Sequence, residues 1–420
     1  MIPSRIRLAA ILFAALCLCG ACARPTLSVR LSALDLGQKA AQVLLIGVEG
    51  SGSPSADTLA LLERMPVGGV VLFGFNLPLE PGDLGQYIAS LQDSVARGAT
   101  ARGGRSQDSP SGKSRSDLPI PLIVAIDHEG GSVFRFKGEG INRIPPPSEV
   151  GAKGAGYASI LGHSAGAELR ALGVNMALAP VVELLTDENK GFLGSRSYGR
   201  EASVVDAAAG AYIQGLQAEG VAAVAKHFPG NAGEDPHKVL PKLDIDTAVY
   251  ERDYLPRFAS AIRNRVSAVM LSHVVFAALD PERPASLSPA IVHGELRKRL
   301  GFRGLAITDD LGMKALSARS SLEDSAVSAL AAGADLLMMT DMRAAARVRD
   351  AIVLAVKERR LPASRLDEAV RRVLELKRRF RMEGGLDPAQ RAKGLADFPS
   401  IVREDSKRIR SYRVPAASNN

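Results

Sequence analysis

The chain of 420 residues has no tryptophan, and its three cysteines, Cys17, Cys19 and Cys22, all lie near its beginning. Disulfide bonds are therefore excluded in the rest of the chain. The net charge is +8, but lysines and arginines are spread along the sequence and only 5% of the residues are aromatic. Because base stacking needs aromatic side chains beside the basic ones, we expect no nucleic-acid partner.

The first residues combine positive charge with a short apolar stretch. Arg5 and Arg7 precede residues 8–18, which are apolar, as in an export signal. The stretch is too short for a good membrane span. Residues 18–22, Leu-Cys-Gly-Ala-Cys, resemble a relaxed bacterial lipobox. We therefore expect a signal peptide over 1–21, a lipid anchor to the membrane at Cys22 and a linker over 22–34. A cleaved secretory signal is the alternative, and both predict export to the cell envelope, in the periplasm or at the cell surface.

Apolar strand-like runs alternate with helical patterns over residues 35–383. This alternation predicts a parallel sheet covered by helices on both faces. About eight such units fit an α/β fold made of a single (β/α)8 barrel of the TIM type. A doubly wound sheet is the alternative, but no Gly-x-Gly-x-x-Gly follows an early strand. The runs are residues 42–48, 67–73, 122–126, 174–178, 221–225, 268–271, 305–307 and 335–339.

Two segments do not fit the alternating pattern. Residues 99–117 are rich in serine, glycine and arginine and nearly free of bulky apolar residues, which predicts a disordered surface insertion. Residues 384–420 are polar and are expected to form a short C-terminal tail. The rest, 35–383, is expected to be one catalytic domain.

Charged side chains follow the strand-like runs at their C-terminal ends. In a (β/α)8 barrel these ends meet at one mouth, where active sites are built. Taken singly, Asp309 or Asp310 is equally compatible with a helix cap, and His273 with a hydrogen-bonded core histidine. The residues in these positions are Asp127, Glu129, Lys226, His227, His273, Asp309 and Asp310.

The loop after residues 221–225 carries Asp235 and His237 two residues apart. A histidine beside a carboxylate is suited to general acid/base work, because the carboxylate tunes an imidazole that already titrates near neutral pH. With a carboxylate nucleophile, such a pair can carry out retaining glycoside hydrolysis. No His-x-x-x-His or cysteine cluster is present, so we expect no metal and no cofactor.

Six motifs together resemble the family 3 glycoside hydrolases, and within them the bacterial β-N-acetylglucosaminidases. The resemblance covers about residues 36–380, and its motifs occur in the family's order. They are Ile-Asp-His-Glu-Gly-Gly-Ser-Val-Phe-Arg at 126–135, Gly-Val-Asn at 173–175 leading to Ala-Pro-Val at 179–181, Gly-Ser-Arg-Ser-Tyr at 194–198, Lys-His-Phe-Pro-Gly at 226–230, Pro-Ala-Ser-Leu-Ser at 284–288, and Gly-Phe-Arg-Gly-Leu-Ala-Ile-Thr-Asp-Asp-Leu at 301–311.

The resemblance implies roles for single residues. Asp309 corresponds to the nucleophile, and His237 corresponds to the general acid/base, held by Asp235. The expected sugar-binding residues are Asp127, Arg135, Arg196, Lys226 and His227. The implied activity is that of a monomeric, retaining β-N-acetylhexosaminidase, which removes terminal β-linked N-acetylglucosamine from peptidoglycan fragments or other glycans through a covalent glycosyl-aspartate.

The histidine loop departs from the family pattern. Where the family reads His-Gly after Lys-His-Phe-Pro-Gly, and then Asp-Ser-His, this chain has Asn231-Ala232 and Pro236, in a loop about two residues shorter. Proline restricts its own φ and the residue before it, so a stiffer loop is expected. A catalytically impaired sugar-binding lipoprotein therefore stays open as an alternative. A family 3 β-glucosidase or xylosidase, and phosphate in place of water as the acceptor, also stay open.

Overall fold

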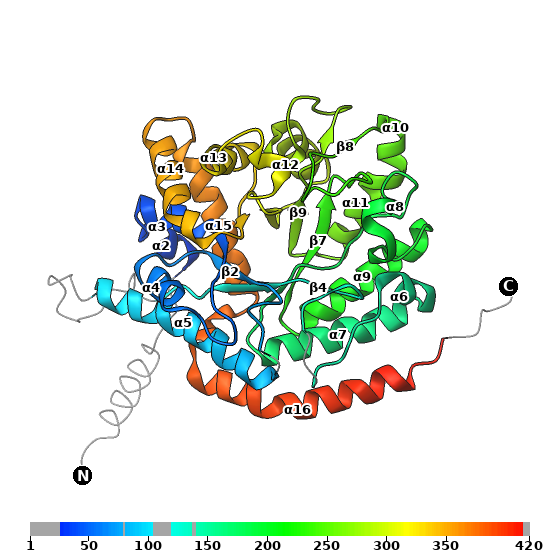
Figure 1. Ribbon diagram of the computed structural model, residues 1–420, viewed down its shortest axis with the longest axis horizontal. Helices are drawn as coiled ribbons and strands as arrows, with labels where there is room; N and C mark the ends of the chain where they lie inside the picture. Colours follow the sequence, from blue (N-terminus) through cyan, green and yellow to red (C-terminus); the bar gives the residue numbers. More distant parts are fainter. Residues whose placement is uncertain (1–25, 79, 104–118, 137–139, 415–420) are drawn as a thin grey trace, which may run out of the picture.

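The computed structural model describes residues 26–78, 80–103, 119–136 and 140–414, and its main body is a barrel of parallel strands (Figure 1). In the order of their hydrogen bonding the strands are β11 (Leu305–Thr308), β9 (Ala268–Leu271), β7 (Ala222–Phe228), β6 (Met176–Ala177), β3 (Ile123–Ile126), β2 (Gly69–Leu72), β1 (Leu44–Gly47) and β12 (Leu337–Met339). A parallel bridge between Ile307 and Leu336 brings the two ends of this sheet together. The predicted (β/α)8 barrel is thus confirmed, and the doubly wound alternative is wrong.

A ring of helices covers the outside of the barrel (Figure 1). Several begin at side chains that accept a hydrogen bond from the first turn, such as Ser55 before α4 and Ser321 before α13. The longer ones are α4 (Ala56–Arg64), α5 (Pro81–Gly103), α7 (Ala155–Ala171), α9 (Ala202–Ala218), α11 (Leu255–Arg263), α13 (Leu322–Ala332) and α14 (Ala345–Lys357). Shorter ones are α2 (Leu27–Ser32), α3 (Leu36–Gln42), α6 (Pro147–Lys153), α8 (Lys190–Leu193), α10 (Thr247–Val249), α12 (Lys314–Ser317), and the π-helices η3 (Tyr250–Tyr254) and η5 (Ala290–Arg299).

The strands are buried on both faces, so they read as continuous apolar runs. The side chains that point into the barrel form one cluster, which includes Leu45, Ile123, Met176, Met270 and Ile307. Where strands approach closely, a small residue is required. A Cβ on Gly69 would lie 2.6 Å from the Cβ and the carbonyl oxygen of Ile123, its neighbour on β3.

Helix α15 (Ala363–Arg379) closes the end of the barrel opposite the mouth. Its Val373 and Leu376, followed by Phe380, pack against the cluster inside the barrel. Fully buried Asp335, two residues before β12, pairs with Arg365 and Arg372 of this helix and with Arg297 of η5. Burial alone would raise the pKa of Asp335, but the three guanidinium groups outweigh it and hold the pKa below its ordinary value.

The C-terminal segment corrects one expectation. Instead of a short polar tail from residue 384, the chain forms η7 (Met382–Leu386) and the long helix α16 (Pro388–Ser411), which packs along α7 and α5 at the base of Figure 1. Asp387 caps α16 and Pro388 fits its first turn. The helix buries little apart from Phe398 and Asp405, so its sequence gives only a weak apolar stripe.

The predicted insertion begins later than expected. Helix α5 continues to Gly103, and Ala99 is buried, so residues 99–103 are helical and not part of a loop. Residues 104–117, the signal segment 1–21 and Cys22 lie outside the described residues. Among the residues that are described, no helix is long and apolar enough to cross a membrane.

Candidate active site

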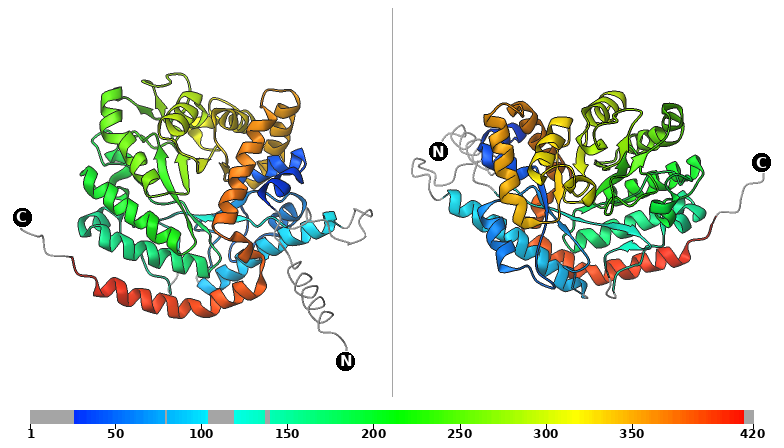
Figure 2. Two further views of the ribbon diagram at one scale, coloured as in Figure 1. Left: turned by 180° about the vertical axis from the view of Figure 1, so that it is seen from behind. Right: turned by 45° about the horizontal axis from the view of Figure 1, so that its top comes forward.

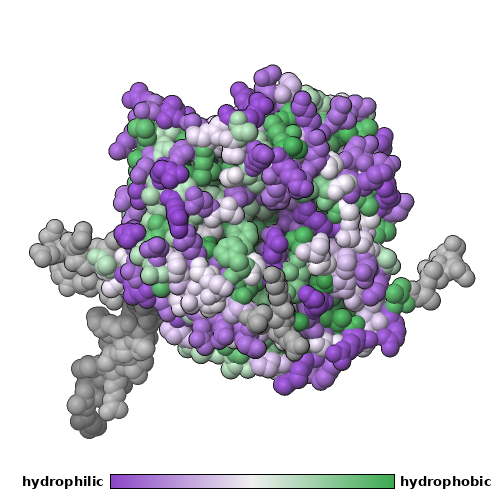
Figure 3. Space-filling view, viewed as in Figure 1, coloured by the Kyte–Doolittle hydropathy of each residue, from purple (hydrophilic) through white to green (hydrophobic). Residues whose placement is uncertain are grey.

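Four of the predicted sugar-binding residues meet at the mouth of the barrel, together with Glu129. Asp127 follows β3, Glu129 lies on β4 (His128–Gly130), and Arg135 follows β5 (Val133–Phe134). Arg196 ends the 3-10 helix η2 (Gly194–Arg196), and Lys226 lies on β7. In Figure 3, hydrophilic and hydrophobic residues lie side by side near the centre of the face.

Lys226 lies between two carboxylates. Its Nζ is 3.0 Å from Oδ1 of Asp127 and 2.7 Å from Oε1 of Glu129. Arg135 donates to the other oxygen of Asp127 at 2.6 Å, while Arg196 donates through Nε and Nη2 to both oxygens of Glu129 at 2.8 Å. The side chain of Glu129 has no exposed surface, whereas that of Asp127 is 15% exposed. Asp127 can therefore reach a ligand, and Glu129 positions Lys226 and Arg196.

The pKa values of Asp127, Glu129 and Lys226 all favour the charged forms at neutral pH. Burial alone would raise the pKa values of Asp127 and Glu129. The positive charges of Lys226 and of the two arginines outweigh burial. They lower the pKa of Glu129 to about 2 and hold the pKa of Asp127 well below its ordinary range. Burial would likewise lower the pKa of Lys226, but the two carboxylates raise it above its ordinary value. Fixed charges that are already paired are well suited to orient the hydroxyl groups of a sugar.

Stability is expected to depend on the ionised form of Glu129. Its pKa falls from 4.5 to about 2 on folding, so its contribution is fully present above pH 4.5 and is lost as the pH falls toward 2. Urea unfolding at intervals between pH 2.5 and 6 should show the free energy of unfolding decreasing with acidity. Glu129→Gln should be less stable at pH 6 and should show a shallower dependence; two parallel curves would contradict this.

Glu183 organises the start of the histidine loop, and it was not among the predicted residues. Its Oε1 accepts from the backbone N–H of His227 at 2.9 Å and from the ring Nδ1 at 2.8 Å, and it also accepts from Nδ2 of Asn231 at 2.9 Å. Its Oε2 accepts from the backbone N–H of Asn231 at 2.6 Å. With Nδ1 of His227 donating, Nε2 is left as the acceptor; it lies 3.4 Å from Nη2 of Arg196. Glu183 comes directly after the apolar residues 176–182, so the rule that found the other strand-end charges also applies to it.

Glu183→Gln is expected to destabilise the protein by about 1–3 kcal/mol, because an amide nitrogen would replace the acceptor of a buried backbone N–H. Urea unfolding at neutral pH measures the loss. Glu188→Gln, a change of the same type on the same side of the barrel with no hydrogen bond from its own side chain among the described residues, is the control and should be close to neutral. Equal stability of the two variants would contradict the role given to Glu183.

The adjacent carboxylates Asp309 and Asp310 have different surroundings. Both oxygens of Asp310 are occupied: Oδ1 accepts from the N–H groups of Gly312 at 2.9 Å and Thr340 at 3.2 Å, and Oδ2 accepts from the Thr340 hydroxyl at 2.6 Å. The carboxylate of Asp309 accepts a single bond within the described part of the chain, from the N–H of Asp310 to Oδ1 at 2.9 Å. Its Oδ2 is therefore available, and Asp310 holds the turn that presents it.

His273 is the hydrogen-bonded core histidine that the sequence left open. It is buried, with Nδ1 2.8 Å from the hydroxyl of Ser286 and Nε2 3.0 Å from the carbonyl of Asp310. Burial lowers its pKa, although the charges of Asp309 and Asp310 oppose this. A neutral ring satisfies both contacts, because Nε2 donates to the carbonyl of Asp310 and Nδ1 accepts from the hydroxyl of Ser286. The bond to Asp310 holds the turn formed by Asp309 and Asp310.

Asp235 and His237 form the expected pair at the rim of the mouth. Oδ1 of Asp235 accepts from Nδ1 of His237 at 2.7 Å and from the same residue's N–H at 3.0 Å. Partial burial would raise the pKa of Asp235, but these hydrogen bonds and the charges nearby lower it. The ring of His237 is 69% exposed, with Nε2 free to face a ligand. The carbonyl of Pro236 accepts from the N–H of Ala315 at 3.3 Å, which fixes the loop beside the segment that follows Asp309.

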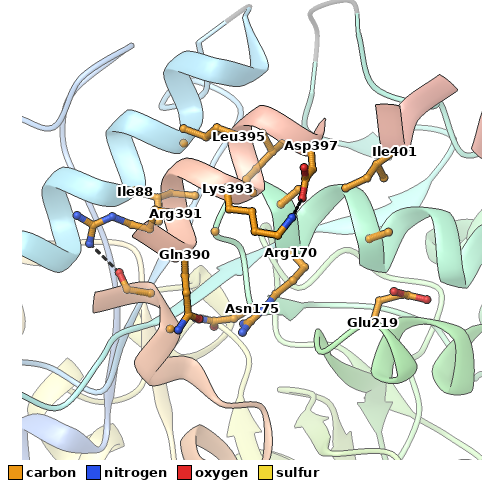
Figure 4. A pocket seen from close by; sticks show the side chains of 18 of the residues that line it. Ile88, Arg170, Asn175, Glu219, Gln390, Arg391, Lys393, Leu395, Asp397 and Ile401 are labelled. Carbon is orange, nitrogen blue, oxygen red and sulfur yellow. Dashed lines mark hydrogen bonds and ion pairs between the residues drawn. The ribbon is translucent and has the colours of Figure 1, made fainter. Parts of the chain in front are cut away.

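A cavity of about 440 Å³ lies elsewhere, between α5, α7, η7 and α16 (Figure 4). Arg170, Gln390 and the Lys393–Asp397 ion pair line it, and none of the predicted site residues does. Over the described ranges, no group of three or more histidine, cysteine, aspartate or glutamate side chains is placed to hold a metal ion.

Known proteins are similar to this chain in sequence and fold. The β-hexosaminidase of Thioalkalivibrio sulfidiphilus is 40% identical over 320 residues, covering 74% of this chain and 84% of the relative. The structure of a glycoside hydrolase family 3 β-N-acetylglucosaminidase from Paenibacillus sp. str. FPU-7 matches with a TM-score of 0.75 and 36% identity, over 83% of this chain but 63% of that one. The β-N-acetylhexosaminidase of Beutenbergia cavernae matches with a TM-score of 0.69 and 29% identity, over 82% of this chain and 98% of its own.

The model of the glycosyl hydrolase family 3 N-terminal domain matches residues 35–376, which include every strand of the barrel and every residue of the mouth described above. With the barrel, the strand-end charges and the relatives in agreement, the chain is a glycoside hydrolase and belongs to glycosyl hydrolase family 3.

Proposed function

We propose that the chain is a retaining β-N-acetylhexosaminidase that releases terminal β-linked N-acetylglucosamine from peptidoglycan fragments or other glycans. The observation that carries the proposal is the unoccupied oxygen of Asp309, supported from below by Asp310 and His273, at the same mouth as the Asp127–Lys226 cluster. The names of the relatives supply the sugar: a β-hexosaminidase and a β-N-acetylglucosaminidase.

In the first step, Oδ2 of Asp309 attacks the anomeric carbon, and the bond from that carbon to the leaving oxygen breaks. The protonated Nε2 of His237 gives its proton to the leaving oxygen, while Asp235 stabilises the imidazolium through Nδ1. The product of this step is a glycosyl ester of Asp309. Asp127 and Arg135 are placed to hold hydroxyl groups of the sugar meanwhile.

In the second step, His237, now neutral, takes a proton from a water molecule. The oxygen of that water molecule attacks the anomeric carbon, and the bond from this carbon to Asp309 breaks, which frees the carboxylate. Two displacements at one carbon retain its configuration. The loop contact between Pro236 and Ala315 supports this role for His237, because it holds the loop near Asp309.

A panel of aryl β-glycosides tests the activity. We expect turnover of the β-N-acetylglucosaminide with retention, followed by NMR of the first-formed anomer, and little turnover of the plain β-glucoside or β-xyloside. Faster turnover of the plain sugars would favour a β-glucosidase or xylosidase instead. Adding inorganic phosphate distinguishes the acceptor: glycosyl phosphate appears only if phosphate replaces water.

A second candidate is a sugar-binding protein with impaired catalysis, favoured by the 69% exposure of the His237 ring in a short loop. Calorimetry with N-acetylglucosamine and a parallel turnover assay distinguish the two functions. Binding without turnover, unaffected by His237→Ala, would support the second candidate.

We also propose that the protein is exported, attached to a membrane through a lipid on Cys22, and monomeric. The sequence of residues 1–22 supports export and the lipid anchor. Metabolic labelling with a fatty-acid analogue should mark the parent chain, and Cys22→Ser should lose the label and leave the membrane fraction. Light scattering of the detergent-solubilised chain tests the oligomeric state.

A further inference from the structure

The end of the barrel opposite the mouth carries five arginines that we call the basic underside: Arg30, Arg265, Arg378, Arg379 and Arg381. They come from α2, from the turn between α11 and β9, and from the end of α15 and the turn after it. Seen from behind, α15 passes in front of the barrel, with α2 packed beside it (Figure 2, left). Residues far apart in sequence thus place their charges on one face.

Within the described ranges, none of the arginines of the basic underside forms an ion pair, although Glu383 lines the same small pocket as Arg30 and Arg378. Over the part of the chain that the structure describes, no carboxylate oxygen lies within 4.0 Å of any of the five side chains. Arg379 instead donates to the backbone carbonyl of Arg265 at 3.3 Å. Burial and then the charge of Arg265 lower the pKa of Arg379. Arg265 and Arg379 therefore lie close enough to repel each other, a cost that an anionic partner would remove.

Two arginines of the basic underside, Arg265 and Arg381, have backbone conformations with positive φ. Among the described residues, the non-glycine positions with positive φ are all arginines: Arg265 at 59°, Arg359 at 62° and Arg381 at 48°. Each follows the end of a helix, where glycine is the usual residue because it adopts this conformation without strain. The helix dipole accounts for cations in a last helical turn, but not for arginine at the strained position beyond it.

We propose that the basic underside docks on an anionic lipid surface and so directs the mouth, at the other end of the barrel, away from the membrane. Helix α2 begins at Leu27, five residues after Cys22, a tether of at most roughly 18 Å when extended. Val29 on α2 is 45% exposed beside Arg30, as suits an interfacial contact. The attraction of arginines to acidic headgroups acts over about 8–10 Å, within reach of such a tether. The proposal relies on the proposed lipid anchor only to bring the membrane to this end.

The test uses the absence of cysteine after Cys22, which lets one engineered thiol carry a fluorescent label. Ala331→Cys labels the underside at the end of α13, and Ala278→Cys labels the mouth side beyond β10 (Val275–Phe276); both positions are exposed. The full lipidated chain is reconstituted into phosphatidylcholine vesicles with a headgroup quencher, with or without phosphatidylglycerol. With phosphatidylglycerol at low salt, we expect about threefold stronger quenching at 331 than at 278, disappearing at about 0.5 M salt.

Charge variants provide the decisive comparison. Arg265→Gln, Arg379→Gln and Arg381→Gln together should abolish the extra quenching while leaving attachment to vesicles and aryl-glycoside turnover unchanged. The control removes three exposed arginines from other parts of the surface and should keep the extra quenching at position 331. Its substitutions are Arg200→Gln, Arg343→Gln and Arg347→Gln. Equal quenching of the two labels in anionic vesicles, or equal behaviour of the two triple variants, would overturn the proposal.

Failure of the anchor gives a different result. A chain that stays in solution with neutral vesicles would refute lipid attachment, and salt-sensitive co-sedimentation with phosphatidylglycerol vesicles would then decide the docking: binding lost in the underside variant supports it, and no binding overturns it. The underside variant is also tested with isolated peptidoglycan. If the parent chain binds peptidoglycan but not these vesicles, and the underside variant does not, the basic underside binds the cell-wall polymer and the proposed docking on lipid is overturned.

Discussion

Asp309→Asn is expected to lower kcat for an aryl β-N-acetylglucosaminide by on the order of 10⁴-fold or more, with little change in stability. The amide cannot form the glycosyl ester, so the two-step route is closed. Oδ2 of Asp309 accepts no hydrogen bond within the described chain. Replacing this oxygen by an amide nitrogen should therefore leave no buried donor unsatisfied. Steady-state kinetics and urea unfolding of the purified variant measure the two effects.

The neighbouring carboxylate is the matched control. Asp310→Asn keeps one oxygen acceptor but disturbs the contacts with Gly312 and Thr340 that hold the turn. We expect it to lower kcat by about 10–100-fold and stability by about 1–2 kcal/mol. In the parent, a fluorinated sugar should leave a mass increment on the peptide that contains Asp309. A larger kinetic loss at Asp310, or a mass increment on Asp310, would reverse the assignment.

The barrel could be predicted from sequence because its strands are buried on both faces. A strand with helices on one side and the barrel core on the other must be apolar throughout, so the run 268–271 coincides with β9, and 122–126 differs from β3 by one residue. Helix α16 escaped prediction for the opposite reason. It lies on the surface and buries few apolar side chains, so its composition matches that of a solvated tail.

The candidate site was predictable where charge follows a strand and not where it depends on tertiary contacts. Asp127 and Lys226 each follow an apolar run, and in the barrel Nζ of Lys226 lies 3.0 Å from Oδ1 of Asp127. Nothing in the order of residues shows that Glu129 would be buried under Arg196, which ends η2 nearly seventy residues later. The different roles of Asp309 and Asp310 likewise depend on Thr340, thirty residues away. Its hydroxyl and N–H donate to the carboxylate of Asp310, whereas the carboxylate of Asp309 stays available.

His237→Ala is expected to separate substrates by their leaving groups. An alkyl leaving group needs the proton, so its release should slow by about 10²–10⁴-fold, whereas a nitrophenolate leaves unaided and the formation of the glycosyl ester should slow by less than about tenfold. Asp235→Asn should give an intermediate loss, because the ring keeps a partner but loses the charge that stabilises the imidazolium. Pre-steady-state kinetics with both substrates measure the first step directly.

His163→Ala is the matched control, because this histidine is also paired with a carboxylate, Glu219 at 2.8 Å, but lies on α7 away from the mouth. It should keep the parent's rates with both substrates. Small anions such as azide should restore turnover of the nitrophenyl substrate by His237→Ala and yield the β-glycosyl azide, because they attack the glycosyl ester without needing a base. If His237→Ala slowed both leaving groups equally and azide had no effect, the short loop would not deliver its histidine to the substrate, and the proton would have to come from another group at the mouth.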